Sequence, residues 1–265
     1  MTKVKAFATH LGISFVIFLV ILSFIIFVWY PPPFFSSDGG WQGIRIIAGV
    51  DLVLGPVLTL IVFKPGKPGL KFDLTVIGII QTCALAWGIW TVHHERPIAT
   101  VFVDNYFAPV TLYEIQGKGM SATKLQAFGN KPPYWIYSNI SENPDALQKA
   151  RLEALRMGRP LFLFTEYYSP LDEKAMQVIR THSLDMQKWV QDKPAAQRRY
   201  QDFLKRHHGG KNLAFIPWHA RQRYEIIALD IATRKYVGTL DIAPPKPSEK
   251  DPLTGSPLKS SSGNK

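Results

Sequence analysis

The stretch LGISFVIFLVILSFIIFVWY, residues 11–30, contains no charged residue and decides the fold class. Twenty helical residues rise about 30 Å, which matches the hydrocarbon core of a bilayer. Trp29 and Tyr30 end the run, where an aromatic belt sits at the membrane interface, and three prolines, residues 31–33, then stop the helix. The run is too long for the apolar region of a usual signal peptide, and no small-residue cleavage pattern follows. We therefore interpret it as an uncleaved transmembrane anchor.

Two further apolar runs follow this anchor, at residues 44–63 (IRIIAGVDLVLGPVLTLIVF) and 72–92 (FDLTVIGIIQTCALAWGIWTV). Each is long enough to cross a bilayer as a helix. The acid near the start of the third run, Asp73, lies in a first helical turn, where negative charge is favourable. The sequence thus predicts a three-helix membrane domain over residues 1–92.

Lysines are distributed unevenly over the loops, and this predicts the orientation. Lys3 and Lys5 precede the first span, and the loop at 64–71 holds three more lysines, whereas the loop at 31–43 has no Lys or Arg. Short cytoplasmic loops carry the excess of positive charge. We therefore expect a multi-pass inner-membrane protein with a cytoplasmic N-terminus, whose C-terminal domain lies in the periplasm of a Gram-negative cell.

Residues 93–243 are expected to form this periplasmic domain, of the α+β class. Strands are predicted at 98–104, 109–115, 160–164, 213–218, 224–230 and 235–242, and helices at 143–157, 170–191 and 194–208. Residues 244–265 are rich in Pro, Ser, Lys and Gly without apolar periodicity, so they predict a disordered tail.

The net charge of +11 suits nucleic acid, anionic lipid or an acidic protein as a partner. No nucleic-acid-binding motif accompanies it, so a solvated surface near anionic membrane lipid is the favoured interpretation. Cys83 is the single cysteine, which excludes an intrachain disulfide and a cysteine-based zinc site.

Motifs of catalysis and cofactor binding are missing from the sequence, including the P-loop, GxSxG, GxGxxG, CxxC and HExxH patterns. The histidine pairs at 93–94 and 207–208 are sequence neighbours, which point apart on a helix. Asp172 and Glu173 suit the first turn of a helix better than a pair of catalytic carboxylates. We therefore predict no catalytic residue, no cofactor and no metal, although the sequence leaves open an active site assembled from distant residues.

Asp51 is the informative polar residue, because an ionisable side chain inside a bilayer costs about 2.5–3.5 kcal/mol on insertion scales. A rise of about 1.5 Å per helical residue places it roughly 10 Å below the outer interface. Ser23 and Trp87 come to a similar depth on the other two spans and are the predicted donors to Asp51. Gln81 is expected about one turn lower.

Pro56 has no N–H to bond to Leu52, so a kink is predicted near Asp51–Gly55. Such a polar site serves either to hold three helices together or to contact a partner directly, and the sequence does not separate the two functions.

Several of these features together resemble the type IV pilin accessory proteins, the TfpX/TfpZ group. They are the run GVDLVLGPVLTLIVF at 49–63, the span containing Gln81, and Arg96-Pro97 leading into Val101-Phe102. The resemblance covers most of residues 1–115. It implies an inner-membrane protein that assists the stability or assembly of one major pilin, with no catalytic residues to transfer. Relatives are expected to have Asp-Arg after the first outer strand, where this chain has Asp104-Asn105.

The leading hypothesis is a non-catalytic accessory factor for a type IV major pilin. The main alternative is a membrane-anchored enzyme, such as a transferase, that acts on pilin or on envelope polymers. A sensor is less favoured, because the cytoplasmic loop at 64–71 leaves no room for an output domain.

Overall fold

A computed structural model describes residues 2–117, 120–121, 123–210 and 212–245. The chain divides into two compact units, residues 1–97 and 98–265, which we call the helical unit and the sheet unit. The division falls after Pro97, slightly beyond Val92, where the third span was predicted to end. Most of the predicted tail, residues 244–265, lies outside the described residues.

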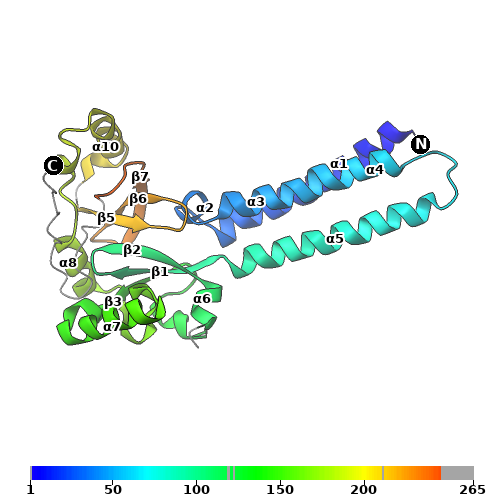
Figure 1. The fold of residues 1–265 in the computed structure, drawn as a ribbon. Coiled ribbons are helices and arrows are strands. Elements are labelled where there is room, and N and C mark those ends of the chain that lie inside the picture. The colour runs from blue at the N-terminus through cyan, green and yellow to red at the C-terminus, as the bar shows by residue number, and fades with distance from the viewer. Residues whose placement is uncertain (1, 118–119, 122, 211, 246–265) are drawn as a thin grey trace, which may run out of the picture. The chain divides into compact units, whose positions relative to one another are not determined.

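The helical unit contains three long helices that run side by side (Figure 1). Each is long and apolar enough to cross a membrane, and they extend over Lys3–Trp29, Gly40–Val62 and Leu70–His94. This confirms the three predicted apolar helices, although the first begins eight residues before the predicted start at residue 11 and the other ends differ from the predictions by one to four residues. The elements are α1 (Lys3–Phe24), η1 (Ile25–Trp29), α2 (Phe34–Ser37), α3 (Gly40–Ala48), η2 (Gly49–Leu54), α4 (Gly55–Val62) and α5 (Leu70–His94).

Large apolar side chains cover the outer surface of these helices. Phe15, Phe27 and Phe72 are 50%, 77% and 72% exposed, in three separate parts of the unit. A soluble protein rarely leaves so continuous an apolar surface in water. The exposure therefore indicates that the helical unit is associated with a membrane.

The sheet unit is built on a seven-stranded mixed sheet of order β4-β3-β1-β2-β5-β6-β7. Pairing is parallel between β1 and β3 and between β2 and β5, and antiparallel in β3–β4, β5–β6 and β6–β7. The strands are β1 (Pro97–Val103), β2 (Tyr106–Thr111), β3 (Tyr134–Ser138), β4 (Tyr168–Pro170), β5 (Leu213–His219), β6 (Tyr224–Asp230) and β7 (Lys235–Leu240). This sheet-containing domain confirms the predicted combination of strands and helices.

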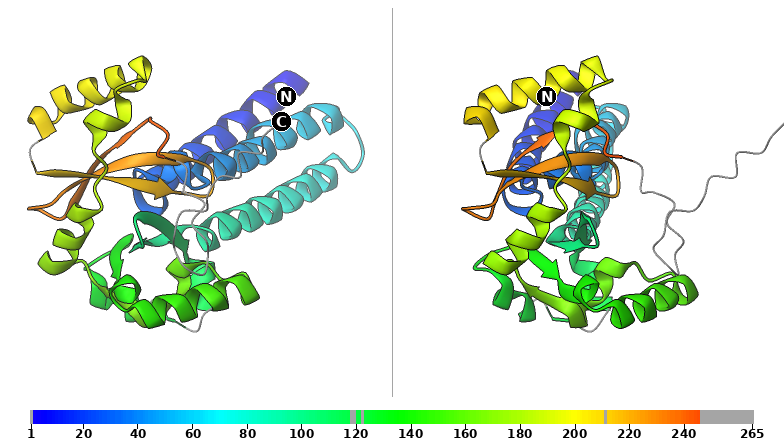
Figure 2. Two further views of the ribbon diagram at one scale, coloured as in Figure 1. Left: turned by 60° about the vertical axis from the view of Figure 1, so that its left-hand side comes forward. Right: turned by 90° about the vertical axis from the view of Figure 1, so that its left-hand side faces the viewer.

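Helices pack around this sheet, with α7 and α10 near its opposite ends (Figure 2). The α-helices are α6 (Leu112–Gly117), α7 (Pro144–Met157), α8 (Glu173–Thr181), α9 (Met186–Val190) and α10 (Pro194–Arg206). Short 3-10 helices are η3 (Lys124–Phe128), η4 (Asn139–Glu142), η5 (Leu161–Leu163), η6 (Thr165–Tyr167) and η7 (His208–Gly210).

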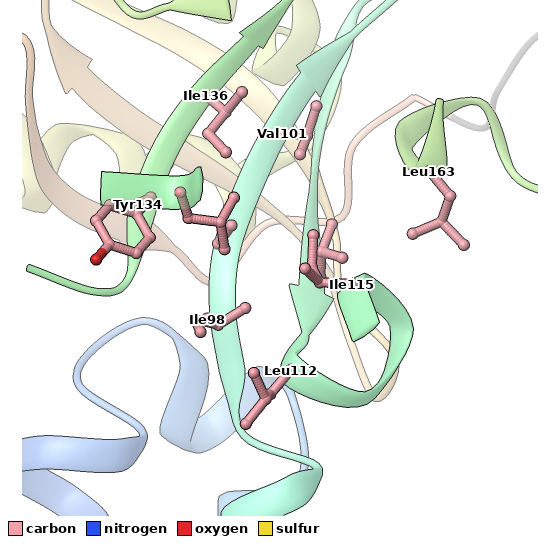
Figure 3. Close-up of a cluster of buried hydrophobic side chains, with 10 residues drawn as sticks. Ile98, Val101, Leu112, Ile115, Tyr134, Ile136 and Leu163 are labelled. Atoms are coloured by element: carbon pink, nitrogen blue, oxygen red, sulfur yellow. The ribbon is translucent and has the colours of Figure 1, made fainter. Parts of the chain in front are cut away.

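The described part of the sheet unit has three apolar clusters, and two of them are large. One joins β1 and β3 to α6 and η5, through residues such as Val101, Ile115, Ile136 and Leu163 (Figure 3). The other places α9 and α10 against β5–β7, with Phe203 buried on the helix side. Burying one such side chain contributes about 1.5–3 kcal/mol. Strands β1, β5 and β6 are buried at nearly every position, so both of their faces belong to the core.

Three segments differ from the predictions. Residues 112–115, expected to continue a strand, begin helix α6, and the buried run 160–164 forms the 3-10 helix η5 rather than a strand. The predicted helix 170–191 is interrupted between α8 and α9, where Leu184 N–H donates to the carbonyl of Phe215 on β5. Strands β3 and β4 were not predicted.

His219, at the end of β5, stacks on Tyr106 at 4.2 Å between ring centroids and meets Tyr224 edge-on at 5.2 Å. Burial lowers the pKa of His219 below its ordinary value of 6.5, and burial together with the Asp104 and Tyr224 charges raises the pKa of Tyr106 to about 12. Since the unfolded chain takes up the His219 proton first as pH falls, stability decreases from about pH 6.5 down to the folded pKa.

His219→Phe is therefore expected to reduce the loss of thermal stability between pH 7.5 and pH 5.0, because it keeps the stacked ring and removes the titration. The measurement is thermal unfolding of the full chain, recorded with a signal that reports on the sheet unit. An unchanged pH dependence in the variant would show that other groups cause the loss.

Candidate functional site

Asp51 lies at the centre of a polar cluster among the three long helices and is 2% exposed. It belongs to the π-helix η2, in which the N–H of Gly55 bonds to the carbonyl of Val50, five residues earlier. Pro56 follows, and without an N–H it cannot continue the α-helical bonding pattern. The segment where a kink was predicted, near Asp51–Gly55, thus contains a π-helix, a form frequent at functional sites.

Two other helices donate hydrogen bonds to the same oxygen of Asp51. Ser14 of α1 donates from Oγ to Asp51 Oδ1 over 3.2 Å, and Gln81 of α5 donates from Nε2 over 2.5 Å. Gln81 Nε2 is also 3.3 Å from Ser14 Oγ. One carboxylate oxygen therefore connects all three helices of the unit.

Gly55 provides the space for this contact. A Cβ atom at position 55 would lie 2.1 Å from Gln81 Oε1 and 2.6 Å from Gln81 Nε2. Real Cβ atoms essentially never come so close to another heavy atom. Any side chain at this position would therefore push the amide away from Asp51.

A second polar pair extends the cluster along α1 and α4. His10 Nδ1 is 2.6 Å from Thr59 Oγ1, and Thr59 is 5% exposed. His10 precedes Ser14 by four residues, so the two lie on the same face of α1. The sequence analysis missed His10, Ser14 and Thr59, although polar residues at this spacing inside an apolar helix were a visible signal.

The predicted donors Ser23 and Trp87 are not part of the cluster, so that prediction is wrong. Ser23 donates to the carbonyl of Leu19 in its own helix, and Trp87 is 69% exposed beside Trp90. The second long helix begins at Gly40 instead of position 44 and the third ends at His94 instead of 92, so both depths estimated from the helix ends were too small. The hydrogen bond between Asp51 and Gln81 shows that Asp51 lies level with Gln81, which had been expected one turn lower.

The cluster is incompletely satisfied within the described part of the chain. Asp51 Oδ2 and Gln81 Oε1 are both buried without a hydrogen-bond partner. Both atoms are acceptors, and a buried acceptor without a donor is destabilising by about 1–3 kcal/mol. The arrangement therefore holds helices together and leaves two acceptors for an additional donor.

The sheet unit has its own titratable cluster at the start of α8. Glu142 accepts from Lys174 Nζ at 2.8 Å and from the Tyr137 hydroxyl at 2.9 Å. These two hydrogen bonds lower the pKa of Glu142, and burial with the Glu142 contact raises that of Tyr137. Asp172 caps α8 by accepting from the N–H of Ala175, as expected for a first-turn acid. Among the described residues, His, Cys, Asp and Glu form no group of three suited to a metal ion.

Comparison with known proteins finds three relatives, each of which is named a fimbrial assembly protein. The chain is 37% identical to the fimbrial assembly protein of serogroup E1 of Dichelobacter nodosus over 101 residues, which cover 37% of this chain and 39% of the relative. It is 34% identical to the protein of serogroups C1 and C2 over 101 residues, which cover 76% of that relative. The chain belongs to the fimbrial assembly protein family.

A third member of the fimbrial assembly family, from serogroup I of the same bacterium, is 34% identical over 101 residues, or 39% of its length. The match thus spans well under half of two of these relatives. No family model matches the chain, and no solved structure matches it.

Proposed function

We propose that this protein is an inner-membrane accessory factor that assists the stability or assembly of one type IV major pilin by binding it. The observation that carries the proposal is the identity of 34–37% to fimbrial assembly proteins over 101 residues. The sequence resemblance to the TfpX/TfpZ group supports the narrower assignment. The two units support it as well, because a membrane-held pilin has an apolar helix and a globular head, each of which needs a different contact surface.

The test is co-purification of the full-length protein with the major pilin of its own cell, with an unrelated major pilin as the control. We expect retention of the cognate pilin and little retention of the foreign one. Deletion of the gene is expected to lower surface pili or pilin stability, and exchange of the cognate pilin for the foreign one to remove that dependence. Equal retention of both pilins would contradict a specific accessory function.

An enzyme is the alternative function. Alanine substitutions in the Tyr137–Glu142–Lys174 cluster of the sheet unit distinguish an enzyme from a binding protein. Binding energy is spread over an interface, so single alanine substitutions there are expected to give graded losses of pilus yield. Loss of a catalytic acid or base would remove a factor of about 10² or more in rate. If Glu142→Ala abolishes piliation while the protein stays folded and bound to pilin, the binding function is wrong.

The proposed topology puts the N-terminus in the cytoplasm and the sheet unit in the periplasm. Single cysteines at the exposed positions Ser36, Pro68 and Gln187 in a Cys83→Ser background test it. After outer-membrane permeabilisation, an impermeant maleimide is expected to label positions 36 and 187 and to spare 68, because the lysine-rich loop stays inside. Labelling at position 68 alone would show that the orientation is opposite to the proposed one.

A further inference from the structure

A cavity of about 470 Å³ lies in the sheet unit, between α8 and the turn that joins β6 to β7. Its lining includes the apolar residues Met176 and Ile231 and the polar residues Glu173, Gln177, Arg180 and Arg234. The cavity is distinct from the Asp51 cluster, which belongs to the helical unit. Its mixed lining suits a ligand that has both an apolar part and a charge.

Both walls of the cavity are held in place by hydrogen bonds or packing. Helix α8 is capped by Asp172, and its Met176 and Ile179 are 1% and 0% exposed. In the turn, Asp230 Oδ1 accepts from the N–H groups of Ala232 and Thr233, over 2.8 and 2.9 Å. The two arginines therefore extend from rigid supports.

Arg234 occupies a backbone conformation that arginine rarely adopts. Its φ is +58°, in the left-handed region, which costs about 1–2 kcal/mol for a residue with a Cβ. Glycine or asparagine is the usual residue in such a turn position. An arginine retained at this cost points to the function of its side chain.

Neither Arg180 nor Arg234 has an ion-pair partner among the residues that the structure describes. A guanidinium binds a carboxylate through two parallel hydrogen bonds, which are stronger than neutral ones. Glu173 is seven residues before Arg180 on α8, or about 10 Å at 1.5 Å per residue. Along the α8 wall Arg180 thus lies two helical turns from the acceptor Glu173, and Arg234 adds a second positive charge from the turn.

We propose that this cavity binds an acidic side chain of the pilin, with Arg180 and Arg234 on the carboxylate. Met176 and Ile231 contact the apolar stem of the acidic residue. The inference rests on the proposed function, since it specifies where the sheet unit contacts its partner.

Photo-crosslinking in the cell with the full-length chain tests this inference. Benzoylphenylalanine replaces Gln177 in the cavity or, as the control, Gln201 on the exposed side of α10. The major pilin is expected in an adduct with position 177 and not with position 201. Arg180→Ala with Arg234→Gly is expected to lower the adduct yield roughly tenfold or more, since two charge-assisted hydrogen-bonding groups are lost. Arg234→Gly also relieves the left-handed strain, so the fold is retained.

The matched control substitution is Arg198→Ala, an exposed arginine of α10 outside the cavity, which should leave the yield unchanged. Three outcomes overturn the inference while wild-type protein still co-purifies with the pilin. They are no pilin adduct at 177, an adduct with a different protein there, or an equal yield from the double variant. Loss of co-purification by the wild type itself would instead overturn the proposed function.

Discussion

Asp51→Ala is expected to weaken the association of the three helices by about 1–2 kcal/mol, the range of hydrogen bonds between helices in model membrane peptides. Ser14 and Gln81 lose their shared acceptor, and both then carry buried polar groups without partners. Resistance of the purified protein to unfolding in dodecyl sulfate is the measurement. We expect pilin co-purification to fall with it, because a loosened helical unit presents no fixed surface to a partner helix.

Asp51→Ala has the opposite effect on membrane insertion, which it favours. A loss of stability in this variant therefore reports on helix association and not on poorer insertion. Removal of a carboxylate from the membrane interior favours insertion by about 2.5–3.5 kcal/mol on insertion scales. Asp51→Asn keeps an acceptor for Ser14 and Gln81 and supplies donors where Oδ2 has no partner, so it should retain more stability and activity than alanine. Full and equal activity of both variants would contradict a special function for this position.

The sequence was sufficient for the features of the helical unit that depend on composition. Apolar runs predicted the three helices, and the cost of an intramembrane charge selected Asp51, with Gln81 expected about one turn lower. Depth along a helix was estimated from the rise alone, which says nothing about the direction in which a side chain points. Ser14 and Ser23 are nine residues apart, about 13.5 Å along the helix, so the depth estimated for the first span was itself wrong, and only Ser14 contacts Asp51.

In the sheet unit, predictions succeeded where local patterns were strong and failed where long-range pairing decides. The antiparallel strands β5–β7 were predicted from runs of strand-forming residues and, for β6 and β7, from the short hairpin turn between them. Strand β3 has the aromatic run Tyr134–Tyr137 after two prolines, and it becomes a strand through parallel pairing with β1, which is distant in sequence. One miss was avoidable: Thr111 and Glu114 form a reciprocal capping box, over 2.8 and 3.1 Å, and this pattern predicts the start of α6.

Gly55→Ala is expected to destabilise the helical unit by about 1–3 kcal/mol, the cost of overpacking. The added Cβ would lie 2.1 Å from Gln81 Oε1 and 2.5 Å from Gln81 Cδ. A free glutamine side chain would move aside at little cost. This amide is held by its 2.5 Å bond to Asp51, so relief of the clash requires loss of that bond. Gly49→Ala is the control, because its Cβ would meet no atom within 4 Å.

A double-mutant cycle separates this clash from a general effect of alanine in the π-helix. If Gly55 matters because it admits the Gln81 amide, Gly55→Ala combined with Gln81→Ala should be no less stable than Gln81→Ala alone. The two changes share one contact, so their effects should be strongly non-additive. Additive losses in dodecyl sulfate unfolding would mean that position 55 acts through the backbone of its own helix. The cycle thus tests whether Gly55 and the π-helix both allow α5 to approach Asp51.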